Sequence, residues 1–155
     1  MNTLEQYSRL FIAYENGRYY SDSYSPVNVG FGTLYVLPLI VELLVSGSDT
    51  LLLIENPESH LHPKGQAVIA SLIARAAFNG AQIICEPHSD HVINGIRVAV
   101  KEGLLKKADL NILYFDKDIE QNSLIHMIGI DSKGTLSDYP EGFLDEWGIL
   151  MSKLL

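Results

Sequence analysis

The stretch Leu51-Leu-Leu-Ile-Glu-Asn-Pro-Glu-Ser-His-Leu-His-Pro63 decides the fold of this chain. Its four consecutive aliphatic residues predict a strand that is covered on both faces, and the Asn-Pro step ends that strand abruptly. Glu55 therefore stands at the carboxyl end of a buried strand, which is where open α/β sheets bind their ligands. A carboxylate at this place indicates nucleotide chemistry.

A second strand ends in the same way. It runs over residues 81–86, finishes at Glu86 and is followed by the polar segment Pro87-His-Ser-Asp-His91. Between the two strands, residues 63–79 predict a helix, because apolar positions recur at helical spacing and proline suits a first helical turn. A strand, a helix and a strand of these lengths form a parallel crossover unit. We therefore expect both strand ends to lie on one rim of a parallel sheet.

The order of these segments resembles a known family. Residues 28–32, Asn-Val-Gly-Phe-Gly, precede a hydrophobic helix, and the two strands with their polar ends follow. This order is similar to the C-terminal half of a prokaryotic, ABC-like AAA-type ATPase of the RecF and overcoming-lysogenisation-defect kind, which ends in a domain of unknown function. The resemblance covers residues 26–148. It implies an α/β fold in which a partly parallel sheet is flanked by helices, as in half of a P-loop NTPase head, followed by a short β-rich tail and a final helix.

The resemblance also implies roles for individual residues. Gly30, Phe31 and Gly32 match the signature segment, which in such proteins contacts the γ-phosphate of ATP held by a partner subunit. Two glycines let backbone N–H groups approach a phosphate, and a helix from about Thr33 would point its positive end at that anion. The alternative for the glycines is an ordinary turn before a core helix. Glu55 matches the Walker B acid, which holds Mg²⁺.

The polar residues after each strand match further parts of the family's site. Asn56 stands where many cassette ATPases have a glutamate that polarises the attacking water, and an amide can orient that water but cannot accept its proton. Glu58 is either a substitute base or a solvated turn carboxylate. Ser59 begins the loop that crosses the dimer interface. His88 matches the switch histidine, a hydrogen-bond donor to the γ-phosphate, with Pro87 in place of the usual threonine.

The P-loop of such an ATPase is missing from this sequence. A Gly-x-x-x-x-Gly-Lys-Ser/Thr string, which cradles the phosphates, does not occur in the 155 residues. We therefore expect a truncated remnant, a split-gene product or a fragment, inactive alone as an ATPase. Its residues would serve a composite site for ATP and Mg²⁺ together with a P-loop-containing segment or subunit, in a homodimer or heterodimer. The resemblance also suggests a nuclease as an effector partner.

The chain divides into three predicted parts. Residues 1–25 are an N-terminal remnant or loop that starts with a candidate helix from Leu4 to Tyr14. Residues 26–103 are the ATPase core half, which closes with a helix over residues 92–101 that Ser89, Asp90 or His91 would cap. Residues 104–155 are the C-terminal domain of unknown function. This domain is predicted to contain strands over residues 109–115 and 123–130, a short strand around Thr135 and a final helix over residues 144–154.

Composition argues against several classes of protein. The net charge of −8 without a basic cluster argues against direct nucleic-acid binding. The longest apolar stretch, residues 34–45, contains Pro38 and Glu42 and is too short to span a membrane. Cys85, the one cysteine, lies in an apolar strand pattern, so we expect a buried small hydrophobe and no disulfide. A cytoplasmic location is the simplest expectation.

Two other functions stay open. His60, His62, His88 and His91 have the residue type and spacing with which a metal-dependent hydrolase could build a zinc or dinuclear site. The chain could also be a non-catalytic interaction remnant of the ATPase. The zinc content of the purified protein would identify the hydrolase, and nucleotide-dependent association with a P-loop subunit would separate an active half-site from a scaffold.

Overall fold

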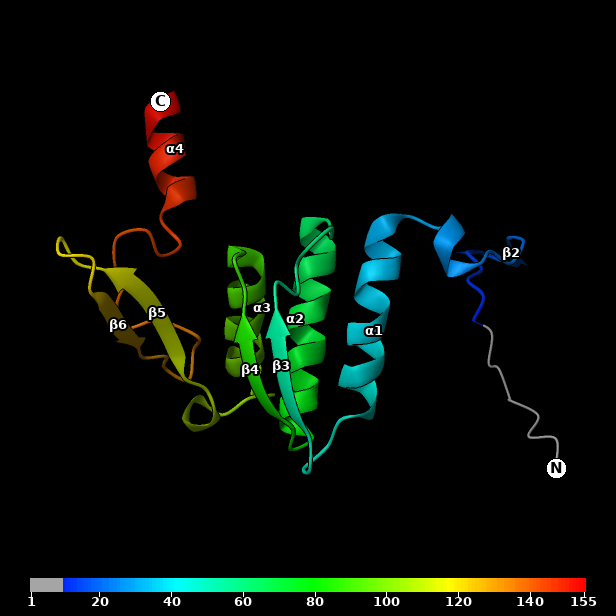
Figure 1. Ribbon diagram of the computed structural model, residues 1–155, viewed down its shortest axis with the longest axis horizontal. Coiled ribbons are helices and arrows are strands. Elements are labelled where there is room, and N and C mark those ends of the chain that lie inside the picture. Colours follow the sequence, from blue (N-terminus) through cyan, green and yellow to red (C-terminus); the bar gives the residue numbers. More distant parts are fainter. Residues whose placement is uncertain (1–9) are drawn as a thin grey trace.

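The computed structural model describes residues 10–155 as a mixed α/β protein (Figure 1), which confirms the predicted class. Its strands form three separate two-stranded sheets within the described residues. The elements follow in this order: β1 (Glu15–Asn16), β2 (Tyr19–Tyr20), η1 (Pro26–Asn28), α1 (Phe31–Val45), β3 (Leu51–Glu55), α2 (Pro63–Phe78), β4 (Gln82–Glu86), α3 (Asp90–Lys101), η2 (Lys107–Asp109), β5 (Ile112–Lys117), β6 (Ser123–Ile128) and α4 (Glu146–Leu154).

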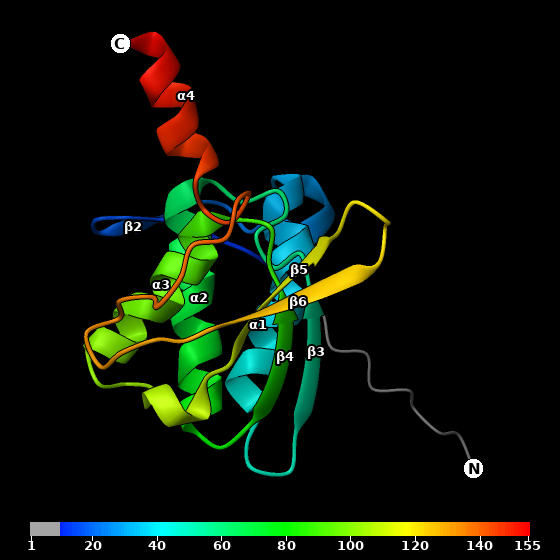
Figure 2. The same ribbon diagram turned by 90° about the vertical axis from the view of Figure 1, so that its left-hand side faces the viewer.

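Strands β3 and β4 form the parallel pair that the sequence predicts. Their register places Leu51 beside Gln82 and Glu55 beside Glu86. Both strands therefore end on the same rim, with their terminal carboxylates next to each other. Helices α2 and α3 lie on one side of this pair (Figure 2), as the crossover connection requires.

No element of the described residues 10–155 covers the opposite side of β3 and β4. Alternate residues of a strand face opposite sides, so Leu52 and Ile54 pack on the helices, whereas Leu53 is 73% exposed. Leu51 and Ile84 share this side and are also exposed. The prediction that β3 is covered on both faces is therefore wrong for the described residues. We call the surface made by Leu51, Leu53 and Ile84 the bare face.

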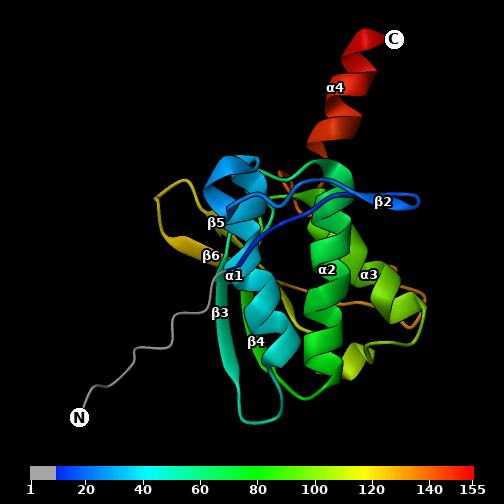
Figure 3. The same cartoon turned by 90° about the vertical axis from the view of Figure 1, so that its right-hand side faces the viewer.

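Helix α1 begins at Phe31, slightly before the expected start near Thr33, so part of the glycine segment lies in its first turn. Figure 3 shows α1 and α2 side by side. Val36 and Leu43 of α1 meet Ile69 of α2 and Ile54 of β3 in the main core. None of the helices in residues 10–155 combines the length and apolarity that crossing a bilayer requires.

Helices α2 and α3 pack against each other through small residues. Ala70 and Ala74 are completely buried, and a Cβ atom added to Gly95 would lie only 2.5 Å from the Cβ of Ala70. The two backbones can therefore approach closely only because position 95 has no side chain.

Replacing Gly95 by alanine should therefore destabilise the protein. We expect Gly95→Ala to lower the free energy of unfolding by about 1–3 kcal/mol, because overpacking outweighs the helix preference of alanine. Gly148→Ala in α4 is the matched control, since its added Cβ would have no atom within 4 Å other than those of its chain neighbours and the nearby backbone of its own helix. Urea denaturation of both variants measures the difference. Equal effects of the two substitutions would contradict the packing argument.

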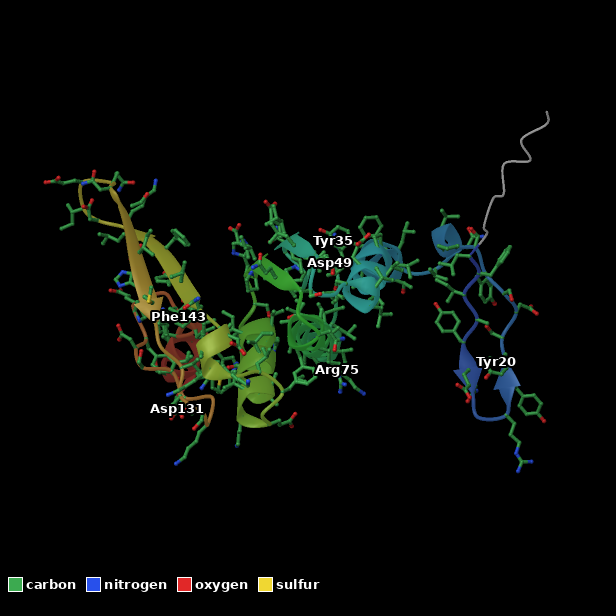
Figure 4. The ribbon with its side chains drawn as sticks, turned by 90° about the horizontal axis from the view of Figure 1, so that it is seen from below. Tyr20, Tyr35, Asp49, Arg75, Asp131 and Phe143 are labelled. Atoms are coloured by element: carbon green, nitrogen blue, oxygen red, sulfur yellow. The ribbon has the colours of Figure 1, made fainter. Side chains whose placement is uncertain are left out.

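The C-terminal part contains the two predicted strands, which pair as an antiparallel hairpin. Strands β5 and β6 pair from Ile112 opposite Ile128 to Lys117 opposite Ser123, with small differences from the predicted ends. The short strand predicted around Thr135 is a single bridge between Ile130 and Leu136. Leu136 packs with Phe143 on the inner face of the hairpin. Figure 4 shows Phe143 beside this hairpin.

Two predicted helices differ from the structure. Helix α4 starts at Glu146 and not at Leu144, because Leu144 has a left-handed backbone with φ 60°. Near the N-terminus, the described part of the candidate helix, residues 10–14, is not helical, and Ile12 forms an antiparallel bridge with Tyr24. The remainder of that helix prediction lies outside the described residues. The following polar segment forms the short hairpin of β1 and β2.

Candidate functional site

Two loops meet at the carboxyl ends of β3 and β4. Residues 56–62 connect β3 to α2, and residues 87–89 connect β4 to α3. The hydrogen bonding between β3 and β4 continues one residue beyond β3, because the backbone N–H of Asn56 donates to the carbonyl of Glu86 at 3.0 Å. Glu55 and Glu86 are both exposed. The structure thus brings Glu55, Asn56 and the loop that carries His88 to one rim, and the roles assigned to these residues stay predictions.

Glu58 joins the two loops directly. Its Oε1 accepts a hydrogen bond from the backbone N–H of His88 at 2.6 Å. Its Oε2 is buried and has no partner in the described part of the chain. A carboxylate acceptor makes such a bond stronger than a neutral one. The interpretation of Glu58 as a solvated turn carboxylate is therefore wrong, because this side chain holds the backbone at His88.

Gln66, in the first turns of α2, makes a second connection. Its Nε2 donates to the carbonyl of Leu61 at 2.9 Å, and its Oε1 accepts from the Ser89 hydroxyl at 2.6 Å. An amide side chain can do both because it carries a donor and an acceptor. The sequence interpretation missed Gln66. A polar residue at the start of the helix that links the two strands was the available signal, since that turn lies next to both loops.

Ser89 caps helix α3. Its hydroxyl oxygen accepts from the backbone N–H of His91 at 3.1 Å, as expected of a residue before a helix. Asp90 is the first residue of the helix and not its cap. An acidic side chain in the first turn of a helix interacts favourably with the helix dipole. The start of α3 is thus fixed both by its own cap and by Gln66.

The first turn of α1 packs on the β3–α2 loop. The ring of His60 lies 4.7 Å from the ring of Phe31 and 5.2 Å from that of Tyr35, between ring centroids. A Cβ atom on Gly32 would collide with the carbonyl oxygen of His60, so this close approach requires glycine. Gly30 differs, because its surroundings are open. The glycine segment and the loop therefore form one continuous surface.

The four histidines of the metal-hydrolase alternative do not form a metal site. Within residues 10–155, no three His, Cys, Asp or Glu side chains come close enough to hold an ion. His60 packs on aromatic rings, and His62 takes the N-cap position of α2. The Nε2 of His88 lies 3.8 Å from Glu86, and the Nε2 of His91 lies 3.8 Å from Asp90. The arrangement proposed for that alternative is therefore wrong in the described part of the chain.

Cys85 lies on the helix side of β4, half-buried against the main core. Burial and, to a smaller extent, the nearby Glu58 carboxylate raise the pKa of Cys85 to about 12. A thiol with so high a pKa is protonated at neutral pH and is a poor nucleophile. The prediction of a buried small hydrophobe is confirmed in part, because Cys85 packs on the core and is only half-buried.

The effect of the Glu58 carboxylate on the pKa of Cys85 can be tested by titration. Glu58→Gln keeps an acceptor oxygen for His88 and removes the negative charge. We expect the pKa of Cys85 to fall, because a neighbouring carboxylate opposes formation of the thiolate. It should stay above the usual thiol value, since burial is the larger cause. The pH dependence of thiol alkylation gives the result.

Glu55→Gln is the matched control for this titration, because Glu55 lies on the opposite side of its strand from the core. Its alkylation profile should equal that of the unmodified chain. An unchanged profile for Glu58→Gln would show that the carboxylate does not act on Cys85.

Comparison with protein families defines the class of this chain. Residues 4–94 match the family described as "AAA domain, putative AbiEii toxin, Type IV TA system", and residues 105–154 match "Protein of unknown function (DUF3696)". Because the first match spans more than half of the 155 residues, the chain belongs to this AAA family. The resemblance to an AAA-type ATPase with a C-terminal domain of unknown function is confirmed. The division at residues 25 and 103 stays a prediction.

Searches of curated proteins and of solved structures gave no match.

Proposed function

We propose that this chain is the part of an AAA-type ATPase that supplies the signature segment, the Walker B acid and the switch histidine to a composite site. A P-loop-containing segment or subunit would hold ATP and Mg²⁺ on the other side of that site. The observation that carries the proposal is the rim of β3 and β4, where Glu55, Asn56 and the His88 loop come together. In open α/β folds this rim is the ligand-binding edge.

The residues at the rim fit Mg²⁺ and a triphosphate. Mg²⁺ is usually held by one or two carboxylates together with waters and phosphate oxygens, so the exposed Glu55 is a sufficient protein acid. The bound ion would neutralise charge on the phosphates. Gly30 is the N-cap of helix α1 and offers no capping side chain, and the Thr33 N–H donates to the Gly30 carbonyl at 2.9 Å. Within the described residues, the N–H groups of Phe31 and Gly32 would be the ones to meet an anion from the partner side.

Each of the residues at the rim then has its own role in the proposed site. Glu55 binds the metal, and the Asn56 amide orients water. The His88 imidazole donates to the γ-phosphate. Glu58 and Gln66 act as positioning residues, because they tie the backbone around His88 and Ser89 to the neighbouring loop and helix.

A second candidate is a non-catalytic module that binds an ATPase partner without turnover. Asn56 favours this alternative, because its amide cannot take a proton from water as a glutamate can. The two candidates share the same surface and differ only in whether phosphate is released once the partner is present.

The isolated chain tests the composite nature of the site. We expect it to release no phosphate from ATP with Mg²⁺, since none of its 155 residues forms a P-loop. The Glu55→Ala variant of the same chain gives the background. Turnover above that background would overturn the composite site and would instead favour a self-contained phosphohydrolase.

A further inference from the structure

The hairpin of β5 and β6 has an outer face that no described part of the chain covers. Across the strands, Leu113 pairs with Met127 and Phe115 pairs with Ile125, so all four side chains share this face. They are 46%, 75%, 63% and 61% exposed, in that order. We call these four residues the outer hairpin face. A two-stranded sheet needs a covering layer to be stable.

Helix α4 is the second uncovered apolar element. None of its residues is buried. Trp147, Leu150 and Leu154 recur at spacings of three and four, so they form one stripe, and each is more than half exposed. The helix projects away from the rest of the molecule in the three ribbon views (Figures 1 to 3).

This helix cannot reach the outer face of its own hairpin. Phe143 is buried on the inner face, with its ring 5.3 Å from that of Tyr114, and the Tyr114 hydroxyl donates to the carbonyl of Glu141 at 3.2 Å. From Phe143 to the start of α4 the chain can span about 10 Å. Layers on opposite faces of a sheet lie roughly 20 Å apart, because each packs about 10 Å from it. Docking within one chain would therefore withdraw Phe143 from the core.

We propose that α4 of one copy of this chain covers the outer hairpin face of a second copy, in a reciprocal two-fold dimer. A helix packed on a sheet is a standard way to bury both apolar surfaces. In a two-fold dimer each copy gives its helix and receives the other, so the contact occurs twice. Two such contacts would bury on the order of 1,500 Å², which is the size of a stable specific interface.

Charges at the ends of the two elements favour one direction of docking. The hairpin turn, residues 116–120, carries three acidic side chains and Lys117, for a net charge of −2, whereas residues 106–109 before β5 carry two lysines and Asp109, for a net charge of +1. Helix α4 begins with Glu146 and has Lys153 in its last turn. Opposite charges therefore meet when the start of α4 lies over the base of the hairpin and Lys153 lies over the acidic turn.

The first test measures the oligomeric state of the chain and the fluorescence emission of its only tryptophan. With rising concentration we expect sedimentation velocity to show a dimer and the emission of Trp147 to shift to the blue. Phe115→Glu should weaken the dimer at least tenfold. Phe78→Glu is the matched control, because Phe78 of α2 is 66% exposed and Phe115 is 63% exposed. A chain that stays monomeric, or a dimer that both variants weaken equally, would overturn the proposal.

The second test locates the contact by cross-linking and does not depend on how Phe115→Glu folds. Met127→Cys and Leu150→Cys chains are prepared separately and treated with a short bismaleimide, alone and mixed. The chain that carries only the native Cys85, which is half-buried, is treated in the same way as the control for that thiol. We expect a cross-linked dimer from the mixture alone. Cross-linked dimers from either variant alone, or a cross-linked monomer from a chain with both cysteines, would refute docking of α4 on a second copy.

Discussion

Replacing His88 by alanine in the assembled ATPase is expected to lower kcat by about 10²–10³-fold, the usual effect of removing one transition-state donor. The affinity for ATP should change much less. A hydrogen bond to the γ-phosphate gains strength as charge shifts during phosphoryl transfer, so its loss affects turnover more than binding. The structure supports a positioned group at this place, because Glu58 holds the backbone N–H of His88 at 2.6 Å while the imidazole stays exposed on the rim.

His91→Ala is the matched control for this experiment. His91 is also exposed and also lies 3.8 Å from a carboxylate, but it belongs to the first turn of α3. Its replacement should leave kcat nearly unchanged. Steady-state phosphate release and equilibrium ATP binding of both variants separate the two effects. If His88→Ala reduces binding and turnover equally, or changes neither, the switch role is wrong.

The bare face of β3 and β4 is expected to be the surface that the P-loop-containing segment covers. Until it is covered, the chain should self-associate and bind a hydrophobic dye, because exposed aliphatic patches and open strand edges attract other chains. Leu53→Lys places a charge at the centre of this face, where Leu53 is 73% exposed. It should weaken association with the P-loop segment at least tenfold, since burying a leucine contributes about 1.5–3 kcal/mol and burying an unpaired charge costs more.

Val98→Lys is the control, because Val98 is a half-exposed aliphatic residue on α3. Dye fluorescence of the isolated chain and co-purification with the P-loop segment are the two measurements. Co-expression with that segment should remove the dye signal in the unmodified chain and not in Leu53→Lys. A cooperatively unfolding monomer that binds no dye would show that this face needs no cover.

The core of the fold could be predicted because its signals are local. The aliphatic run and the Asn-Pro step fix β3 as residues 51–55, and the strand, helix and strand order fixes the parallel pairing that sets Glu55 beside Glu86. The cover of β3 could not be predicted in this way. An aliphatic run indicates that both faces of the strand are apolar, but it does not indicate which segment covers each face.

Non-local contacts account for the predictions that failed or were missing. The candidate helix near the N-terminus gives way in its described part to a bridge between Ile12 and Tyr24, which residue periodicity cannot reveal. The contact of Glu58 with His88 and that of Gln66 with Ser89 join residues 30 and 23 positions apart. Each depends on how two loops approach each other after the helix between them has formed. The rim of β3 and β4 could therefore be predicted from the sequence, whereas the hydrogen bonds of Glu58 and Gln66 that connect its loops could not.

The most direct test of the composite site is Mg²⁺-dependent ATP hydrolysis by this chain joined with a P-loop-containing segment of the AAA family. Glu55→Gln and Glu86→Gln form a matched pair, because the two residues are exposed neighbours at the same register position of β3 and β4. We predict that hydrolysis requires both segments, that Glu55→Gln lowers it by about 100-fold or more through loss of a metal ligand, and that Glu86→Gln retains most of it. Hydrolysis that depends equally on both glutamates, or on neither, would contradict the assignment of Glu55 as the metal-binding acid of a shared ATP site.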